Sequence, residues 1–320
     1  MASVSQKAVI IFGIILLLFC KRDCLALDRS MSSALTHYIM ASVYDSLDNQ
    51  DKAVSEYKKA LKSDYTNSLI HLDLASVYIK SNSIDKAIEE LKLAVKFDPE
   101  GVEPHAILAL LYSLKDNKDS ANKEYEIALQ NASRINPKNA EIYKGLGLLY
   151  VRQKKFDAAI KAYEMALSIA AQDPQTHYYL SNIYYENNNK LKTEEELKAA
   201  INLNPDYSDA LNFLGYFYAE ENKNLDQAEV MVKKALEFDP ENGAYLDSLG
   251  WIYFKQGKDQ EAIKCLLKAA ALVEDPEIYA HLGEVYFKIG DKEKAKINWE
   301  KSLKVDPGQK EIETKLKNLL

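Results

Sequence analysis

The sequence predicts an all-α fold, a solenoid of about eight helix–turn–helix repeats followed by a capping helix at the C-terminal end. Tyrosines recur at an almost constant spacing, and the apolar residues around them follow a helical period. Residues that break helices are rare, with 11 Gly and 8 Pro among 320 residues. Because repeat arrays grow by stacking, the chain length alone does not set the number of domains.

The tyrosine spacing defines the repeat. The sequence numbers of consecutive tyrosines in the series differ by 34, 34, 38, 34, 34, 35 and 33. A period of about 34 residues is typical of stacked helical hairpins. The series consists of Tyr44, Tyr78, Tyr112, Tyr150, Tyr184, Tyr218, Tyr253 and Tyr286.

The eighth repeat shows a single unit most clearly. Its first helix carries an apolar face with residues at i, i+3, i+4 and i+7. This face consists of Tyr279, Leu282, Gly283 and Tyr286. The Gly290-Asp291 pair predicts the turn between the helices, and Asp306-Pro307 predicts the end of the second helix.

These units resemble the tetratricopeptide repeat family. The fourth repeat meets the family pattern with Tyr143, Leu146-Gly147, Tyr150, Ala159, Tyr163 and Ala166. The resemblance covers residues 34–309 and implies a right-handed α-solenoid. The implied repeats are 34–67, 68–101, 102–139, 140–173, 174–207, 208–242, 243–275 and 276–309, preceded by a short lead-in at 27–33 and followed by a capping helix at 310–320.

Four glycines occupy the same position in their first helices. They are Gly147, Gly215, Gly250 and Gly283. A glycine inside a helix costs roughly 1 kcal/mol relative to alanine. We expect this cost to be offset because the missing side chain lets the paired second helix approach closely.

Three repeats depart from the pattern. The third is four residues longer near 131–137, which predicts one additional turn in its second helix. The sixth has one extra residue in the turn at 222–224. The fifth has Ser181 and Thr193 where smaller residues are usual, which predicts looser helix packing at that place.

Residues 1–26 are predicted to be a signal peptide or a membrane anchor. Lys7 is followed by an apolar run without a charge, Ala8 to Cys20. At about 1.5 Å per residue this run spans roughly 20 Å, which is shorter than a bilayer core of about 30 Å. A basic start followed by an apolar run of this length is typical of a secretory signal.

Three fates of this segment stay open. A small-x-small site favours cleavage after Ala26. Lys21 and Arg22, directly after the apolar run, favour an uncleaved anchor in the inner membrane, and Cys20 or Cys24 is a lipidation candidate. Each alternative predicts an exported chain, periplasmic or associated with a membrane of the cell envelope.

The composition argues against nucleic acid as a partner. The net charge is −7, and the 41 basic residues are interspersed with 48 acidic ones. Affinity for phosphate depends on clustered Lys and Arg, which this chain lacks. We expect no nucleic-acid partner, and contact with a membrane only through residues 1–26 if they remain uncleaved or become lipidated.

The histidines invite a metal-site interpretation, which the spacing argues against. His37, His71 and His105 follow one another at the repeat period, and His177 shares their register. Equivalent residues on stacked helices lie on the order of 10 Å apart, whereas zinc ligands lie about 2.0–2.1 Å from the ion. We therefore expect packing histidines, no metal and no other cofactor.

The sequence contains no nucleophile elbow, no glycine-rich phosphate loop and no metalloprotease motif. No segment outside the repeats is long enough for a catalytic domain. We therefore expect no catalytic residues and no enzymatic activity.

The family resemblance implies a partner groove lined by the first helices. Transferred position by position, it predicts an aromatic surface with Asn and acidic groups between the rings. The predicted groove residues are Tyr178, Asn182, Tyr185, Asn212, Tyr216, Asp247, Trp251, Phe254, Glu284 and Phe287. The alternative is that these aromatic side chains pack against the next repeat.

The functional hypothesis is a scaffold or adaptor of the cell envelope that holds an extended peptide or a helix of another protein in its concave groove. By analogy, it would serve outer-membrane, pilus or secretion, or polysaccharide-export assembly. One alternative is a purely structural organiser that binds through its convex face or its termini. Another is the regulatory arm of an enzyme.

Overall fold

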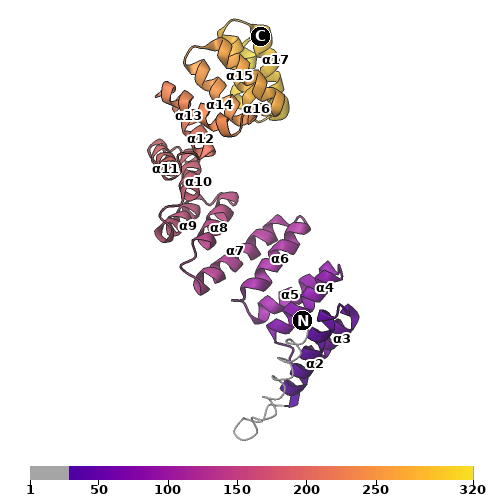
Figure 1. Ribbon diagram of the computed structural model, residues 1–320. Helices are drawn as coiled ribbons and strands as arrows, with labels where there is room; N and C mark the ends of the chain where they lie inside the picture. Colours follow the sequence, from indigo (N-terminus) through magenta and orange to yellow (C-terminus); the bar gives the residue numbers. More distant parts are fainter. Residues whose placement is uncertain (1–28, 320) are drawn as a thin grey trace, which may run out of the picture. The chain divides into compact units, whose positions relative to one another are not determined.

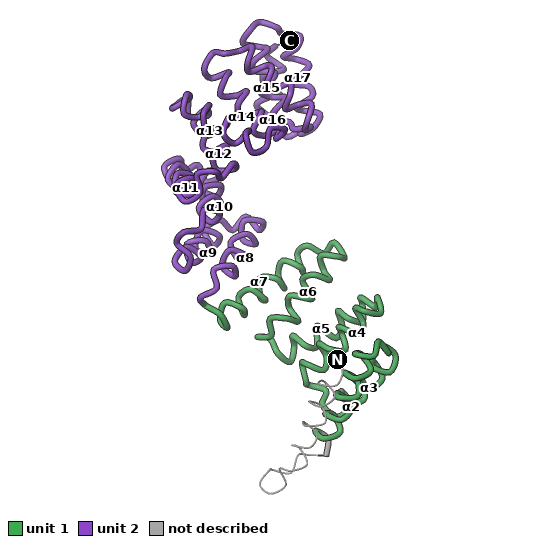
Figure 2. The backbone as a smooth tube through the Cα atoms, viewed as in Figure 1, with its two compact units in different colours: residues 1–137 green, residues 138–320 purple. Residues whose placement is uncertain are grey.

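The computed structural model describes residues 29–319, and every regular element in this range is a helix (Figure 1). The predicted signal or anchor segment, residues 1–26, lies outside the described residues. The helices form two compact units, residues 1–137 and 138–320, and the boundary falls between the third and fourth hairpins (Figure 2). Each unit is described by itself.

Unit 1 is a stack of three hairpins in which each helix packs against the next along the chain. Its core contains Leu74, Leu91 and Leu108, none of which exposes any surface. The helices of unit 1 are α2 (Arg29–Ser46), α3 (Gln50–Ser63), α4 (Ser68–Lys80), α5 (Ile84–Phe97), α6 (Val102–Leu114) and α7 (Lys118–Ile135).

Unit 2 is a stack of five hairpins and one terminal helix. Its helices are α8 (Ala140–Arg152), α9 (Phe156–Ile169), α10 (Pro174–Glu186), α11 (Lys190–Leu203), α12 (Ser208–Glu220), α13 (Leu225–Phe238), α14 (Gly243–Lys255), α15 (Asp259–Leu272), α16 (Pro276–Lys288), α17 (Lys292–Val305) and α18 (Lys310–Leu319). The even-numbered helices α8 to α16 are the first helices of their hairpins. Within the described residues, the predicted all-α solenoid of about eight hairpins is confirmed.

The terminal helix α18 packs on the last hairpin. Ile312 is buried in the same cluster as Trp299 of α17, and Leu316 and Leu319 pack against that cluster. The predicted capping helix is therefore confirmed.

The turn inside every hairpin contains a residue with positive φ. These residues are Asp48, Asn82, Asp116, Lys154, Asn188, Asn222, Gly257 and Gly290. Asn and Asp adopt this left-handed conformation more readily than most residues, because a short polar side chain can bond locally. In the sixth hairpin the extra residue adds a second left-handed position, Asn224.

The glycines of the first helices allow close helix packing, as predicted. A Cβ built on Gly147 would lie 2.6 Å from the ring of Tyr163 on α9. A Cβ on Gly283 would lie 2.2 Å from the indole of Trp299 on α17. Because both aromatic side chains are almost fully buried, they have little room to move away.

The third hairpin has the longer second helix that the sequence predicts. Helix α7 has 18 residues, whereas the other second helices have 14. The added turn is anchored by Asn131, whose buried amide donates a hydrogen bond to the carbonyl of Pro99 at 2.9 Å. The insertion is therefore part of the packed unit.

The prediction of looser packing in the fifth hairpin is wrong. Ser181 and Thr193 expose no surface. The Ser181 hydroxyl donates to the Tyr178 carbonyl at 2.6 Å, and the Thr193 hydroxyl donates to the Asn189 carbonyl at 2.9 Å. Each hydroxyl is satisfied by a nearby backbone carbonyl of its own hairpin, so both side chains are accommodated within the buried interior of the hairpin.

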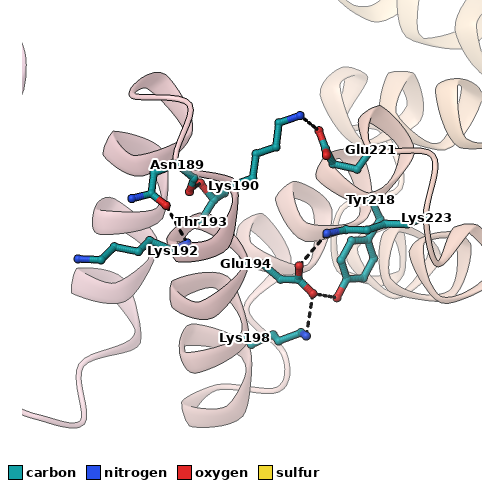
Figure 3. Close-up of polar contacts among 9 residues, drawn as sticks. All are labelled: Asn189, Lys190, Lys192, Thr193, Glu194, Lys198, Tyr218, Glu221 and Lys223. Atoms are coloured by element: carbon teal, nitrogen blue, oxygen red, sulfur yellow. Dashed lines mark hydrogen bonds and ion pairs between the residues drawn. The ribbon is translucent and has the colours of Figure 1, made fainter.

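Glu194 of α11 joins the fifth hairpin to the sixth (Figure 3). Its carboxylate pairs with Lys198 on the same helix and with Lys223 after α12, each at 2.8 Å. The Tyr218 hydroxyl donates to the same carboxylate at 3.0 Å. The hydrogen bonds from the two lysines outweigh partial burial and lower the pKa of Glu194 to about 2.

The same arrangement recurs one repeat later around Glu229 of α13. This carboxylate pairs with Lys233 at 2.6 Å and with Lys258 at 3.0 Å, and the Tyr253 hydroxyl donates to it at 3.4 Å. Burial opposes ionisation, but the hydrogen bonds from the lysines lower the pKa of Glu229 to about 2. The same contacts therefore recur at two successive hairpin junctions of unit 2. At each junction, a tyrosine of the repeating series and a lysine from one repeat bond to a glutamate of the preceding repeat.

Candidate partner-binding site

Four successive first helices of unit 2 line an open cavity of about 590 Å³. Residues of α10, α12, α14 and the start of α16 form its wall. We call it the acidic cavity. Its wall includes Tyr178, Asn182, Asp209, Asn212, Phe213, Tyr216, Tyr245, Asp247, Asp275 and Glu277.

The acidic side chains reach the cavity from the first turns and the interiors of helices. Asp275 caps α16, and its carboxylate accepts a hydrogen bond from the backbone N–H of Glu277 at 2.8 Å. Asp209 lies in the first turn of α12 and accepts a 2.5 Å hydrogen bond from the Tyr245 hydroxyl. Glu277 accepts a 2.6 Å hydrogen bond from the Tyr216 hydroxyl.

The partners of these three carboxylates are neutral groups. Within the described part of the chain, no Lys or Arg lines the acidic cavity. Burial and the Glu277 carboxylate raise the pKa of the Tyr216 hydroxyl far above its usual value, so this hydroxyl stays protonated and donates. Among the described residues, Asp209, Asp275 and Glu277 therefore form no ion pair.

A second cavity, also about 590 Å³, follows toward the C-terminal end. It shares Tyr216 and Glu277 with the acidic cavity, so the Tyr216–Glu277 hydrogen bond lies between the two hollows. Its wall combines acidic and basic side chains, among them Glu220, Glu284, Lys255, Lys310 and Lys315. In this mixed wall Glu284 pairs with Lys315 of α18 at 2.7 Å.

Three stacked rings, those of Trp251, Phe254 and His281, line the second cavity. The ring of Trp251 stacks on His281 with 4.0 Å between centroids, and Phe254 stacks on Trp251 at 5.0 Å. His281 bonds the Asp247 carboxylate through Nδ1 at 2.9 Å. Although burial opposes protonation, Asp247 raises the pKa of His281.

The structure gathers eight of the ten predicted groove residues around these two cavities. The acidic cavity takes Tyr178, Asn182, Asn212, Tyr216 and Asp247. The second cavity takes Tyr216, Trp251, Phe254 and Glu284. Asp247 and Trp251 are largely buried, so they shape the floor more than they offer contact surface.

Tyr185 and Phe287 line neither cavity. Tyr185 packs edge-on against Phe213 with 5.2 Å between ring centroids. Phe287 packs on Trp299 at 5.5 Å and remains 48% exposed. Tyr185 therefore packs against a side chain of the next repeat, which is the alternative to a groove position.

Several cavity residues were missed by the sequence analysis. Asp209, Tyr245, Asp275 and Glu277 lie at or near the beginnings of first helices, whereas the family pattern was applied to helix interiors. The signal that could have found the acidic ones is a carboxylate at the start of a first helix, as Asp209 is for α12 and Asp275 is for α16.

The histidines of the series pack against glutamates of their own hairpins. In each case Nδ1 meets the carboxylate of the residue 19 positions later, at 2.6 or 2.7 Å. The pairs are His37–Glu56, His71–Glu90, His105–Glu124 and His177–Glu196. Across the described residues, no group of three or more His, Cys, Asp or Glu side chains is arranged to hold a metal ion.

None of the helices between residues 29 and 319 combines the length and the apolar character of a membrane span.

Family profiles match most of the hairpins. Profiles described as tetratricopeptide repeat match residues 49–111, 140–173, 208–242 and 276–309, and one described as TPR repeat matches residues 250–290. No curated protein matches the sequence.

Solved structures share the fold at low sequence identity. A tetratricopeptide repeat protein from Parabacteroides merdae is 18% identical with a TM-score of 0.59, over 79% of this chain and 98% of that chain. The APC/C hetero-tetramer Cut9–Hcn1 is 18% identical with a TM-score of 0.59, over 92% of this chain and 56% of the matched chain. PilW, a type IV pilus biogenesis factor, is 17% identical with a TM-score of 0.55, over 67% of this chain and 98% of that chain.

Proposed function

Because this chain is built of tetratricopeptide repeats, we propose that it is a protein-interaction scaffold that binds an extended peptide or a helix of a partner on the first helices of unit 2. The observation that carries this proposal is the pair of adjoining cavities on one face of α10, α12, α14 and α16. Cavities of about 590 Å³ fall in the size range of ligand sites, and two in sequence suit a ligand that runs along the surface.

The side chains around the cavities suit a peptide. Tyr178, Phe213 and Tyr216 offer aromatic area with little conformational freedom to lose on binding. The amide oxygen of Asn212 is buried without a hydrogen-bond partner among the described residues. Asn212 lies in the wall of the acidic cavity, where rotation of its amide group would bring this costly unpaired acceptor to a backbone N–H of a bound peptide.

We also propose that the scaffold works in the cell envelope, as an exported protein in the periplasm or at a membrane. This part depends on the apolar run at Ala8 to Cys20 and its basic flanks. PilW, which has a similar fold, is a pilus biogenesis factor, and by analogy an assembly role in outer-membrane, pilus or secretion, or polysaccharide-export systems is our choice. Export is tested by determining the N-terminal residue and the mass of the protein purified from its native source. An intact, unmodified chain in the cytoplasm would contradict export.

Site-specific photo-crosslinking tests the binding surface. A photo-crosslinking amino acid replaces Asn212 on α12 in one variant and Val230 on α13 in a control, where Val230 is 67% exposed on a second helix. We expect one protein to crosslink in native extract from position 212 and not from 230. Equal capture from both positions, or capture from 230 alone, would place the partner on the other face and reject the proposal.

A further inference from the structure

The acidic cavity brings four carboxylates together, and three of them, Asp209, Asp275 and Glu277, lack a cationic partner among the described residues. Elsewhere in the same unit, the partly buried carboxylates of Glu194, Glu229 and Asp259 are each paired with a lysine. In the cavity, Asp209, Asp275 and Glu277 bond only neutral donors, and Asp247 bonds the buried His281. A hollow lined by one sign of charge focuses the field and favours a ligand of the opposite sign.

The other walls of the cavity fit a long cationic side chain. The rings of Tyr178, Phe213 and Tyr216 can cover the methylene stem of a lysine or the plane of an arginine. A cation within about 6 Å of such a ring face is attracted by the ring as well. Asn212 adds a neutral polar side chain to the same wall.

We propose that the acidic cavity receives a lysine or arginine side chain of the bound partner, so that the partner segment is a basic peptide. This inference rests on the proposed scaffold function and adds the chemical class of the ligand. A bound metal ion fits less well, because the carboxylates of the described residues surround the cavity without converging on one point. An acidic segment is disfavoured because it would bring like charges together.

The decisive variant removes the charge of the cavity while it keeps the hydrogen bonds. In the cavity variant, D209N, D275N and E277Q are combined, because an amide oxygen still accepts from Tyr245, Tyr216 and the backbone of α16. Asn at position 275 remains a good helix cap. The matched control combines E195Q, E237Q and E300Q, three exposed glutamates on the second helices α11, α13 and α17.

The probe is a library of displayed random peptides of about a dozen residues, selected on the full-length chain. The best peptide is then measured by calorimetry, as selected and with each Lys replaced by norleucine, which keeps the length and removes the charge. We expect selected peptides enriched in Lys or Arg. We also expect about tenfold weaker binding after either the norleucine change or the cavity variant, no further loss when both are combined, and no loss in the matched control.

Two results separate this inference from the scaffold proposal. If the selected peptides lose binding in N212A but show neither a preference for basic residues nor a response to the cavity variant, the scaffold proposal stands and the basic-peptide inference is wrong. If basic peptides bind the cavity variant as tightly as they bind the parent chain, their positive charge is recognised at another site, and the inference is also wrong. If no peptide binds the full-length chain, the proposed function itself fails.

Discussion

The Tyr216 hydroxyl donates a 2.6 Å hydrogen bond to Glu277, and in doing so it joins α12 to α16 across the intervening helix α14. The two residues are 61 positions apart, almost two repeats. Most contacts in a stack of this kind join nearest neighbours. This bond therefore couples non-adjacent hairpins at the boundary between the two cavities.

We predict that Y216F destabilises unit 2 by about 1 kcal/mol, because it removes a hydrogen bond to a charged acceptor. Urea unfolding followed by tryptophan fluorescence reports this, since Trp251 and Trp299 both belong to unit 2. The control is Y279F, because the Tyr279 hydroxyl makes no hydrogen bond among the described residues, while its ring lies beneath Lys301. Equal effects of the two changes would show that the bond across α14 contributes nothing.

Replacing Gly283 with alanine is predicted to lower stability, although alanine favours helices by about 1 kcal/mol. The new Cβ would lie 2.2 Å from the Trp299 ring, which is 1% exposed. Forced repacking of this kind typically costs about 1–3 kcal/mol. Circular dichroism during thermal unfolding measures the effect.

The matched control for this change is S181A. Ser181 occupies the corresponding position of the fifth hairpin and already carries a Cβ. Its change removes only a hydrogen bond to the Tyr178 carbonyl, so a loss of at most about 1 kcal/mol is expected. If G283A proves as stable as the parent protein, the close approach of α16 and α17 does not require glycine.

Glu194 makes the free energy of unfolding of unit 2 decrease at low pH. Its folded-state pKa of about 2 is lower than the ordinary value of 4.5, so its contribution is present above pH 4.5 and is lost as the pH falls toward 2. We predict that E194Q costs about 1 kcal/mol or less at pH 7, because the site is partly exposed and screened, and that this cost falls toward zero as the pH drops through 2. Urea midpoints of both proteins between pH 7 and pH 2 measure the difference, and a constant difference over this range would contradict the assignment.

His71 has the opposite pH dependence. Its Nδ1 lies 2.7 Å from Glu90 and its Nε2 lies 2.8 Å from the Tyr65 carbonyl, so both nitrogens face acceptors and favour the protonated ring. Burial opposes protonation, yet these bonds raise the pKa above 6.5. The stabilisation is complete below pH 6.5 and is lost as the pH rises through the folded-state pKa.

We therefore predict that H71Q destabilises unit 1 more at pH 6 than at pH 9, and that E90Q lowers the pKa of His71. An NMR titration of the His71 ring together with urea unfolding at both pH values measures this. A His71 pKa below 6.5 in the parent protein would contradict the prediction.

The sequence predicts the fold well because each repeat contains the same packing pattern in its own residues. The spacing of Tyr150, Gly147 and Tyr163 within one hairpin is sufficient to predict which faces are buried. The longer α7 could be predicted for the same reason, because an insertion of one turn keeps the buried face inward.

The candidate site could be predicted only in part. Tyr178, Asn212 and Tyr216 were placed by their positions within their own helices. Glu277 was not, because its contact with Tyr216 depends on how three successive hairpins turn relative to one another, which no single repeat encodes. The packing of Tyr185 on Phe213 likewise depends on the size of a neighbour in the next repeat.

The central claim is that the first helices of unit 2 hold the partner. Hydrogen–deuterium exchange tests this claim most directly. It is measured on the full-length chain alone and on the chain saturated with either the partner identified by crosslinking or the selected peptide. The account predicts slower exchange in α10, α12, α14 and the first turn of α16, with α11, α13 and α15 unchanged. Protection confined to the second helices, or to unit 1, would contradict it.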